Sequence, residues 1–558
     1  MPLSPPLPSL GRIGPLKSRR GCKACKTRKV KCGEEKPSCR RCLVSRYKCE
    51  YATSTNDSYA AAASSTSILD LPVSTSPNTV WRERRAFAYY FEHAAPYLGG
   101  GLDLDFWACV VPRACRTEPA IWDAVNAIST LFEYPDMCLD FVFLSLRHER
   151  SPALNPKQSE ALRWYSRSLS KIRTQIGRGN VNAQVALISC VLFVCIETLQ
   201  GHVEEALQLY NQGIKLILDL RAKASNFQTT LLEGTLVPLF MRLGSASLSI
   251  SGTSICGLFS NIDNGETYNF TSLGSARDAL IPLSAQVQIL ERESGSNPFI
   301  GLEAEITPEL IARRSRLQEA LRCWYCAYTD LTRRLQSTSP PPVNSNPPIH
   351  ALLVMYHTTL TIITSNCLER SKSVYDAHIP SFRLILEQAT IALDDSANPD
   401  GTQPAFTFEL GVGLPLFWTA MECRDPTLRR KALGLLRKSP PVQSFYKCAT
   451  GVMLAGKIIE QEEALSRDIL HERAQLHGNG TISTTSVDGS EVTKIPEEAR
   501  IHHYAVFRPR DQPFLLGPHD VSKWNRNPEQ LFMRYTWYRS DPHDESALHL
   551  MDECVPME

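Results

Sequence analysis

The stretch that decides the fold of the N-terminal part is residues 22–49, CKACKTRKVKCGEEKPSCRRCLVSRYKC. It contains two copies of the pattern C-x₂-C-x₆-C, joined by residues 33–38. Each C-x₂-C pair can place two thiolates on one metal ion, and the third cysteine of each copy follows about two helical turns later. The repeat supplies six candidate metal ligands: Cys22, Cys25, Cys32, Cys39, Cys42 and Cys49.

The number of cysteines predicts how they share the metal. Two tetrahedral zinc ions need about eight ligand positions in total, so six cysteines can hold both ions only if two sulfurs bridge them. The symmetry of the repeat favours one bridge from each copy, and Cys22 and Cys39, the first cysteine of each, are the natural choice. One ion would be held by Cys22, Cys25, Cys32 and Cys39, and the other by Cys22, Cys39, Cys42 and Cys49.

Two simpler interpretations compete with the two-zinc cluster. The cysteines could be buried core residues, but roughly thirty residues this rich in lysine and arginine cannot form an apolar core without a metal. The two C-x₂-C pairs could instead make one ordinary four-cysteine zinc site. That site would leave Cys32 and Cys49 without a role, although they stand at matching positions in the two copies. The sequence therefore predicts two zinc ions as the cofactors.

The charge distribution points to a polyanion as the partner of this module. The first 50 residues carry 14 Lys or Arg and three Glu, a net charge of +11, whereas the rest of the chain carries −9. Such a short basic module on a mildly acidic body indicates contact with nucleic acid. Lysine donors in a major groove can read guanine, while other basic side chains mostly contact phosphates. The candidate DNA-binding residues are Lys26, Arg28, Lys29, Lys31, Arg40, Arg41 and Arg46.

The cysteine segment resembles the fungal zinc binuclear cluster transcription factors over about residues 20–51. The likeness rests on the cysteine spacing, the basic run at 28–31 and the loop proline Pro37. It implies that Lys29 reads a CGG triplet in the major groove, and that the first and fourth cysteines bridge the metals. Gly33 stands where many relatives have Asp, a departure that should affect the loop but not metal binding.

A composition break follows the cysteines. Of the 29 residues from 51 to 79, 17 are Ala, Ser or Thr and only Asp57 and Asp70 are charged, which predicts a flexible linker. This segment has no apolar heptad, so it does not support the dimerising coiled coil that many relatives have. How the chain would form a homodimer therefore stays open.

Helical periodicity begins at Trp81 and persists to about residue 470. Thr307 and Asp425 are expected to cap helices that begin at the prolines following them. Further helices are expected at 158–176, 183–200, 203–221, 350–367 and 380–394. The segment between His477 and Ile495 could be a small hairpin or a loop. The last 18 residues mix acidic and apolar side chains, which suits an activation segment but is more typical of a disordered terminus.

The predicted fold class is mainly α: a small two-zinc six-cysteine DNA-binding module, a flexible linker and a large all-helical regulatory domain. The expected boundaries are 1–17 for a disordered N-terminus, 18–51 for the module, 52–79 for the linker, 80–540 for the regulatory domain and 541–558 for an acidic C-terminal tail.

Other classes of protein find little support. The apolar run 185–196 is too short to span a membrane and predicts a buried helix. The scattered cysteines fit a reducing compartment, and Cys323-x-x-Cys326 is expected in a helix core. His471-Glu472 lacks the second histidine of a zinc protease, and Gly252-Thr253-Ser254-Ile255 lacks the final glycine of a nucleophile elbow. We therefore predict no enzymatic activity.

These observations predict a nuclear transcription factor that regulates RNA polymerase II genes. Its expected partners are double-stranded DNA with CGG-type half-sites and the transcription machinery or coregulators, with no membrane. The resemblance also implies a regulator of one pathway, including pathways of secondary metabolism. A rival interpretation is a zinc-stabilised cofactor that holds DNA without reading its sequence; insensitivity of its footprint to triplet sequence would distinguish it.

Overall fold

A computed structural model describes residues 22–28, 30–35, 38–45, 48–49, 81–135, 155–179, 182–223, 231–251, 268–295, 299, 305–337, 347–408, 411–476, 495–517, 520, 530–540 and 548–557. The chain divides into two units, Met1–Leu71 and Pro72–Glu558. The predicted disordered N-terminus, the linker and the segment predicted as a hairpin or loop lie outside the described residues. The first unit contains two short helices, α1 (Lys23–Thr27) and α2 (Arg40–Val44).

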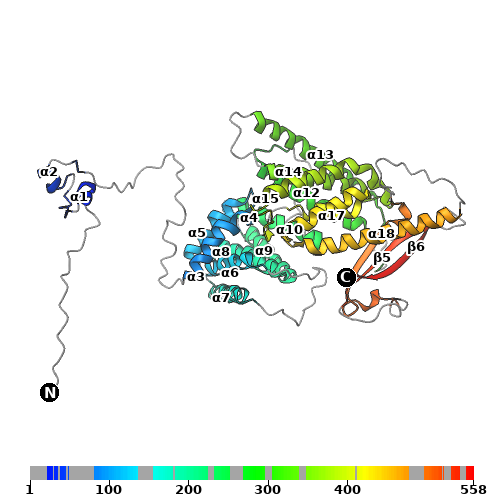
Figure 1. The fold of residues 1–558 in the computed structure, drawn as a ribbon, viewed down its shortest axis with the longest axis horizontal. Coiled ribbons are helices and arrows are strands. Elements are labelled where there is room, and N and C mark those ends of the chain that lie inside the picture. Colours follow the sequence, from blue (N-terminus) through cyan, green and yellow to red (C-terminus); the bar gives the residue numbers. More distant parts are fainter. Residues whose placement is uncertain are drawn as a thin grey trace, which may run out of the picture. The chain divides into compact units, whose positions relative to one another are not determined.

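The second unit is mainly helical (Figure 1). Its α-helices are α3 (Trp81–Tyr89), α4 (Ala95–Gly99), α5 (Val111–Thr117), α6 (Pro119–Glu133), α7 (Pro156–Gly177), α8 (Ala183–Leu199), α9 (Val203–Lys223), α10 (Val237–Ser251), α12 (Leu273–Ser294), α13 (Pro308–Ser337), α14 (Pro347–Asn366), α15 (Ile379–Ser396), α16 (Gly413–Glu422), α17 (Pro426–Lys438) and α18 (Cys448–Leu476). Shorter π and 3₁₀ turns are η2 (Tyr90–Ala94), η3 (Phe106–Val110), η5 (Leu232–Leu236), η7 (Lys372–His378), η8 (Glu497–Ala499) and η9 (Pro513–Leu515).

The structure confirms the helices expected from periodicity. The five predicted ranges correspond to α7, α8, α9, α14 and α15. Both predicted caps are present: the Leu310 amide donates to Thr307 Oγ1 at 3.3 Å, and the Leu428 amide donates to the Asp425 carboxylate at 2.9 Å. These helix starts can be predicted from short stretches of sequence. The capping side chain bonds an amide a few residues away, and the proline after it fits the first helical position.

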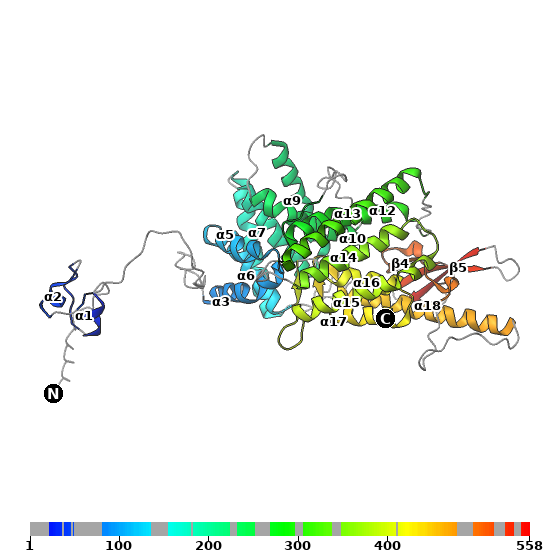
Figure 2. The ribbon, with the colours of Figure 1, turned by 90° about the horizontal axis from the view of Figure 1, so that it is seen from above.

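The helices of the second unit surround several apolar cores. One core lies among α3 to α10, which are grouped at one end of the second unit (Figures 1 and 2), and α8 is buried along most of its length. A second joins α12, α13 and α14, and a third joins α14 to α18 with the C-terminal strands. No helix in the described part of the chain is long and apolar enough to cross a membrane. The apolar run in α8 is therefore a core helix, as predicted.

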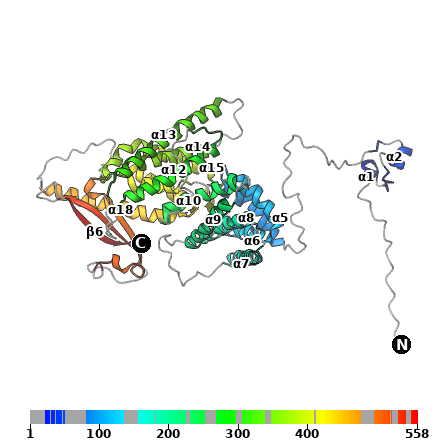
Figure 3. The same cartoon turned by 180° about the vertical axis from the view of Figure 1, so that it is seen from behind.

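The described part of the second unit also contains two small sheets, which the prediction of an all-helical domain did not include. Strands β1 (Phe406–Thr407), β2 (Val442–Gln443) and β3 (Tyr446–Lys447) form one of them; β1 and β2 are parallel, and β2 and β3 antiparallel. The other is antiparallel, in the order β4 (His503–Phe507), β5 (Phe532–Ser540) and β6 (Leu548–Pro556). Figures 1 and 3 show β5 and β6 beside α18, and the Tyr535 hydroxyl donates to Gln461 Oε1 of that helix at 3.1 Å.

The interpretation of the C-terminal residues as a disordered terminus was wrong for the described part. Residues 548–556 pair with β5 along their length, and Cys554, Val555 and Met557 are buried. Arg534 Nε of β5 donates to the Asp552 carboxylate at 2.8 Å across the strands. The prediction failed because it used only the local composition, which is acidic. The strand that orders these residues, β5, is not adjacent to them in sequence, so local composition does not reveal the pairing.

The expectation for Cys323 and Cys326 also needs correction. Both lie on α13, as predicted, but Cys326 is exposed and Cys323 is only partly buried. The buried face of α13 is formed by other residues, including Trp324 and Tyr328. The two cysteines occupy the outer side of an amphipathic helix, because the core stripe passes between them.

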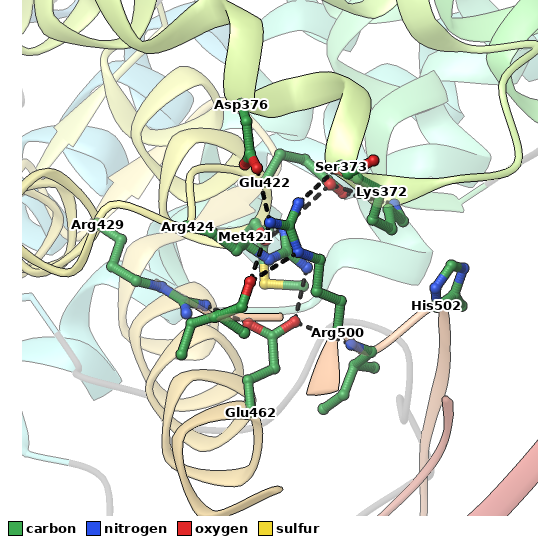
Figure 4. A network of polar contacts seen from close by, with 12 residues as sticks. Lys372, Ser373, Asp376, Met421, Glu422, Arg424, Arg429, Glu462, Arg500 and His502 are labelled. Carbon is green, nitrogen blue, oxygen red and sulfur yellow. Dashed lines mark hydrogen bonds and ion pairs between the residues drawn. The ribbon is translucent and has the colours of Figure 1, made fainter. Parts of the chain in front are cut away.

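A buried ionic network centred on Glu462 joins the helices to the segment that precedes β4 (Figure 4). Glu462 of α18 is 0 % exposed and accepts hydrogen bonds from Arg424 at 2.6 Å and from Arg429 at 2.8 Å. It also accepts from the Ile501 amide at 2.9 Å. One carboxylate thus connects the α16–α17 junction, α18 and the C-terminal segment.

Arg500 makes a second connection from the same segment (Figure 4). Its guanidinium donates to the Lys372 carbonyl oxygen at 2.9 Å and to the Asp376 carboxylate at 2.8 Å, both in η7. The Arg500 side chain is 1 % exposed, so these bonds lie in a region where an unpaired charge would be costly. The segment before β4 is therefore hydrogen-bonded to η7 through Arg500 as well as to α18 through the Ile501 amide.

Candidate metal centre

The two helices of the N-terminal unit reproduce the sequence repeat in three dimensions. Each begins directly after the first cysteine of its copy: Cys22 is the N-cap of α1 and Cys39 is the N-cap of α2. Both cap residues have an extended backbone, with ψ of 155° and 146°. The extended caps turn the chain so that the second cysteines, Cys25 and Cys42, lie in the first helical turns and face the sulfurs of the caps.

The same backbone-to-sulfur hydrogen bond is present in both copies. The Cys22 amide donates to Cys32 Sγ at 3.4 Å, and the Cys39 amide donates to Cys49 Sγ at 3.2 Å. In each copy the first cysteine therefore holds the third cysteine in place. Amide hydrogen bonds to sulfur stabilise thiolates, which are the form that binds zinc.

The six sulfurs form two groups of four. Cys22, Cys25, Cys32 and Cys39 make one group; Cys22, Cys39, Cys42 and Cys49 make the other. Within each group all sulfurs lie within 4.8 Å of one another. Cys22 and Cys39 belong to both groups, and their sulfurs are 3.8 Å apart. This arrangement agrees with the ligand sets predicted from the sequence.

The sulfur spacing fits zinc. A tetrahedral site with Zn–S bonds of about 2.3 Å places its sulfurs about 3.8 Å apart. The sulfur of Cys25 lies 3.6 Å from that of Cys39, and the sulfur of Cys22 lies 3.6 Å from that of Cys42. Five of the cysteines are at most 7 % exposed, and Cys49 is partly buried. The residues present can therefore hold two zinc ions, which would cross-link the two copies and replace an apolar core.

Burial and hydrogen bonding give the cysteine thiols unequal proton affinities. Burial raises the pKa of Cys25 to about 12. Burial also opposes ionisation of Cys39, but hydrogen bonds from the Cys42 amide and from neighbouring thiols outweigh it and lower the pKa of Cys39 to about 6. The two thiols therefore differ in pKa, although both must lose their protons to bind zinc.

The predicted DNA-binding residues that the structure describes lie on the outside of the module. Lys26, Arg28 and Lys31 are exposed on and just after α1, and Arg40 and Arg41 are exposed on α2. Lys29 and Arg46 lie outside the described residues. Lys26, Arg40 and Arg41 are thus presented by the two helices that the cysteines anchor, while Arg28 and Lys31 follow the end of α1.

Sequence reasoning missed one structural residue of the module, Glu35. Its carboxylate accepts a hydrogen bond from the Arg40 amide at 3.0 Å, at the start of α2. This bond is the main reason that the pKa of Glu35 is lowered. The signal was present, because an acidic residue shortly before a helix favours an interaction with its unsatisfied amides. Four residues separate Glu35 from Arg40, however, and a capping residue is normally sought closer to the start of its helix.

Comparison with known proteins places this geometry in a family. Residues 20–58 match the fungal Zn(2)-Cys(6) binuclear cluster domain, and residues 85–452, well over half of the chain, match the fungal specific transcription factor domain. The chain belongs to the fungal specific transcription factors. Its cysteine module is the zinc-binding, DNA-binding part of this regulator, and its cofactors are two zinc ions, as predicted.

Two relatives of this fungal regulator have been named. It is 24% identical over 569 residues to the aspercryptin biosynthesis cluster-specific transcription regulator atnN of Emericella nidulans, a match covering 80% of this chain and 88% of that protein. It is 29% identical over 155 residues to the Zn(2)-C6 fungal-type transcription factor afumD of Aspergillus fumigatus, covering 25% of this chain and 41% of that protein. No solved structure matches the chain.

Proposed function

We propose that this transcription factor acts in the nucleus and reads CGG-type triplets in the major groove through its zinc cluster. The observation that carries the proposal is the pair of four-sulfur groups sharing Cys22 and Cys39. With two zinc ions bound, this arrangement holds α1 and α2 as one rigid unit. Rigidity matters because base reading requires side chains to be held in fixed register against the groove.

Within the module, the role proposed for Lys29 comes from the family resemblance, and the roles of the other basic residues come from their position and charge. Lys29 reads guanine edges, while Arg41 and Arg46 contact phosphates. Lys26, Arg28, Lys31 and Arg40 also face the DNA; exposure of their described side chains supports this placement. Arg28 lies at the C-terminal cap of α1, where the helix dipole favours a cation.

The helical body is proposed to connect DNA binding to the transcription machinery or coregulators. The longer of the two named matches is to a cluster-specific regulator of a biosynthetic pathway, which supports the proposal that this chain regulates one pathway of secondary metabolism. A homodimer on paired half-sites is compatible with the proposal, but it would need contacts other than a coiled coil in residues 51–79.

The decisive experiment is a binding titration of the full-length, zinc-loaded chain on two duplexes of equal length. One duplex carries a CGG triplet and the other carries the same bases scrambled. The proposal requires preference for the CGG duplex by at least about tenfold, since each good base contact discriminates by about 1–3 kcal/mol. Equal affinity for both duplexes would identify a zinc-stabilised module that holds DNA without reading it. Genome-wide mapping of bound sites would then name the pathway.

A further inference from the structure

The helical body has a surface recess at its first helix. Its volume is about 380 Å³, and it is lined by residues of α3, the end of α6 and the first turns of α7. These elements pack on one another, because α6 contacts both α3 and α7. A recess of this size falls within the range of roughly 300–1,000 Å³ that is usual for small-molecule sites.

Aromatic side chains form much of the recess. Trp164 is 8 % exposed and gives it a fixed wall, whereas Trp81 is 68 % exposed at its edge. Tyr134 also lines it, with the Lys157 ammonium 5.8 Å from the centre of its ring. Such an exposed tryptophan is available to stack on a flat ring, a contact that favours aromatic ligands.

The recess is positively charged. Four basic and two acidic side chains line it, a net charge of +2. The two acids are already paired: Glu133 accepts from Arg85 at 2.5 and 2.9 Å, and Glu160 lies 3.6 Å from Arg82. Lys157 interacts electrostatically with Glu133, which Arg85 already binds, and Arg163 forms no ion pair among the described residues, so the positive charges of the recess outnumber the negative ones.

The two remaining cations both belong to α7. Lys157 stands in its first turn and Arg163 two turns later, and both side chains are exposed. The positive N-terminal end of this 22-residue helix lies at the recess, as does the negative C-terminal end of α6, so the excess positive charge comes from the side chains. Positive charge that the protein does not itself neutralise is available for an anion from solution.

We infer that this recess binds a small organic anion with a flat aromatic ring, of the class of aromatic carboxylates. Lys157 and Arg163 hold the carboxylate, and Trp81 and Trp164 take the ring. The paired residues Arg82 and Arg85 form the rim and contribute little net charge. Because the recess belongs to the helical body, such a ligand is a candidate signal for the regulator, and its binding can be measured without DNA.

The test is calorimetric titration of the full-length, zinc-loaded chain with 2-naphthoate and with its neutral analogue 2-naphthamide. Saturable binding of one naphthoate per chain is expected, with the amide about fivefold weaker, because it loses two exposed charge pairs that contribute about 0.2–1 kcal/mol each. Absence of saturable naphthoate binding, or equal affinity for acid and amide, would overturn the inference.

Variants locate the binding in the recess. Arg163→Gln and Lys157→Gln should each weaken naphthoate binding about two- to fivefold, and Trp81→Ala should weaken acid and amide alike. The matched control is Arg173→Gln, which removes the same charge from the same helix about 15 Å further along. It should leave the affinity unchanged. If Arg173→Gln weakens binding as much as Arg163→Gln, the anion is held by general surface charge and the proposed site is wrong.

Discussion

Cys22 and Cys39 differ from the other four cysteines because each belongs to both four-sulfur groups. A sulfur that serves two ions cannot be removed without opening both coordination shells, whereas a sulfur that serves one ion affects mainly that ion. Single-residue substitutions can therefore distinguish a cluster with shared sulfurs from two independent zinc sites.

We expect substitutions of these cysteines to have unequal effects on zinc content. Cys22→Ala and Cys39→Ala should each reduce the zinc content from two ions per chain to less than about one, while Cys25→Ala should retain about one. Elemental analysis of the purified full-length variants measures this directly. Equal zinc loss in all three variants would argue against bridging by the first and fourth cysteines.

Lys29 is the residue on which sequence reading is proposed to depend. Lys29→Ala should cost about 1–3 kcal/mol of binding free energy on the CGG duplex and much less on the scrambled duplex. Arg41→Ala is the comparison, since loss of a phosphate contact should weaken both duplexes similarly and lower the salt slope by about one. Titrations at several salt concentrations measure both quantities. A Lys29→Ala variant that weakens both duplexes by the same factor would remove Lys29 from the base-reading role.

At the scale of the elements, the packing of the α16–α17 junction against α18 is stabilised by one buried carboxylate, that of Glu462. Glu462 neutralises Arg424 and Arg429, and all three side chains are almost completely buried. Removing one partner of such a group leaves charges in a medium that solvates them poorly. The neighbouring residue Glu463 offers an internal comparison, because its ion pair with Arg430 is at the surface.

Glu462→Gln should lower the free energy of unfolding of the helical body by about 3–5 kcal/mol, because it leaves the buried Arg429 without its carboxylate partner and Arg424 with Glu422 alone. Glu463→Gln should cost less than about 1 kcal/mol, since its exposed partner stays hydrated. Urea unfolding followed by helical circular dichroism compares the two variants with the parent. Similar costs for both would show that the buried network contributes no more than a surface ion pair.

The same residue predicts how stability depends on pH. Burial opposes ionisation of Glu462, but Arg424 and Arg429 outweigh it and lower its pKa. A lowered folded-state pKa stabilises the fold above the unfolded pKa of about 4.3 and loses this contribution as the pH falls through the folded value. The stability difference between the parent and Glu462→Gln should therefore narrow below about pH 4. A constant difference from pH 7 to pH 3 would contradict this assignment.

At the scale of the whole molecule, the chain consists of two units with different sources of stability. The first unit depends on metal and the second on apolar cores. Although the family match in the second unit ends at residue 452, the strands β4 to β6 contribute fully buried side chains such as Met533 and Tyr535 to its core. The C-terminal residues are therefore part of the folded body.

Two truncations test this organisation. A fragment of residues 72–558 should keep the helical signal and unfolding midpoint of the full chain, because the described residues of its cores all belong to the second unit. A fragment of residues 72–476 should lose more than about 3 kcal/mol, since it uncovers the apolar face beneath β5 and the Glu462 network. Circular dichroism melts measure both fragments. Equal stability of the two would show that the C-terminal sheet is dispensable.

The sequence by itself determined the zinc module, the mainly helical class and several helix starts. These features are local: the ligand count, the spacing of Cys22 to Cys49 and the caps at Thr307 and Asp425 act over a few residues or through one metal cluster. The seven basic residues were readable as candidates for the same reason, although their individual roles stay predictions.

Only the tertiary structure decided the rest. Strand β6 exists because β5 pairs with it. The Glu462 network forms because the α16–α17 junction, α18 and the segment before β4 meet, and the aromatic recess forms because α3, α6 and α7 pack together. Each depends on contacts between residues far apart in the chain. Such contacts depend on how the apolar faces of the elements pack together. Neither the composition nor the periodicity of one segment specifies which other segment it will contact.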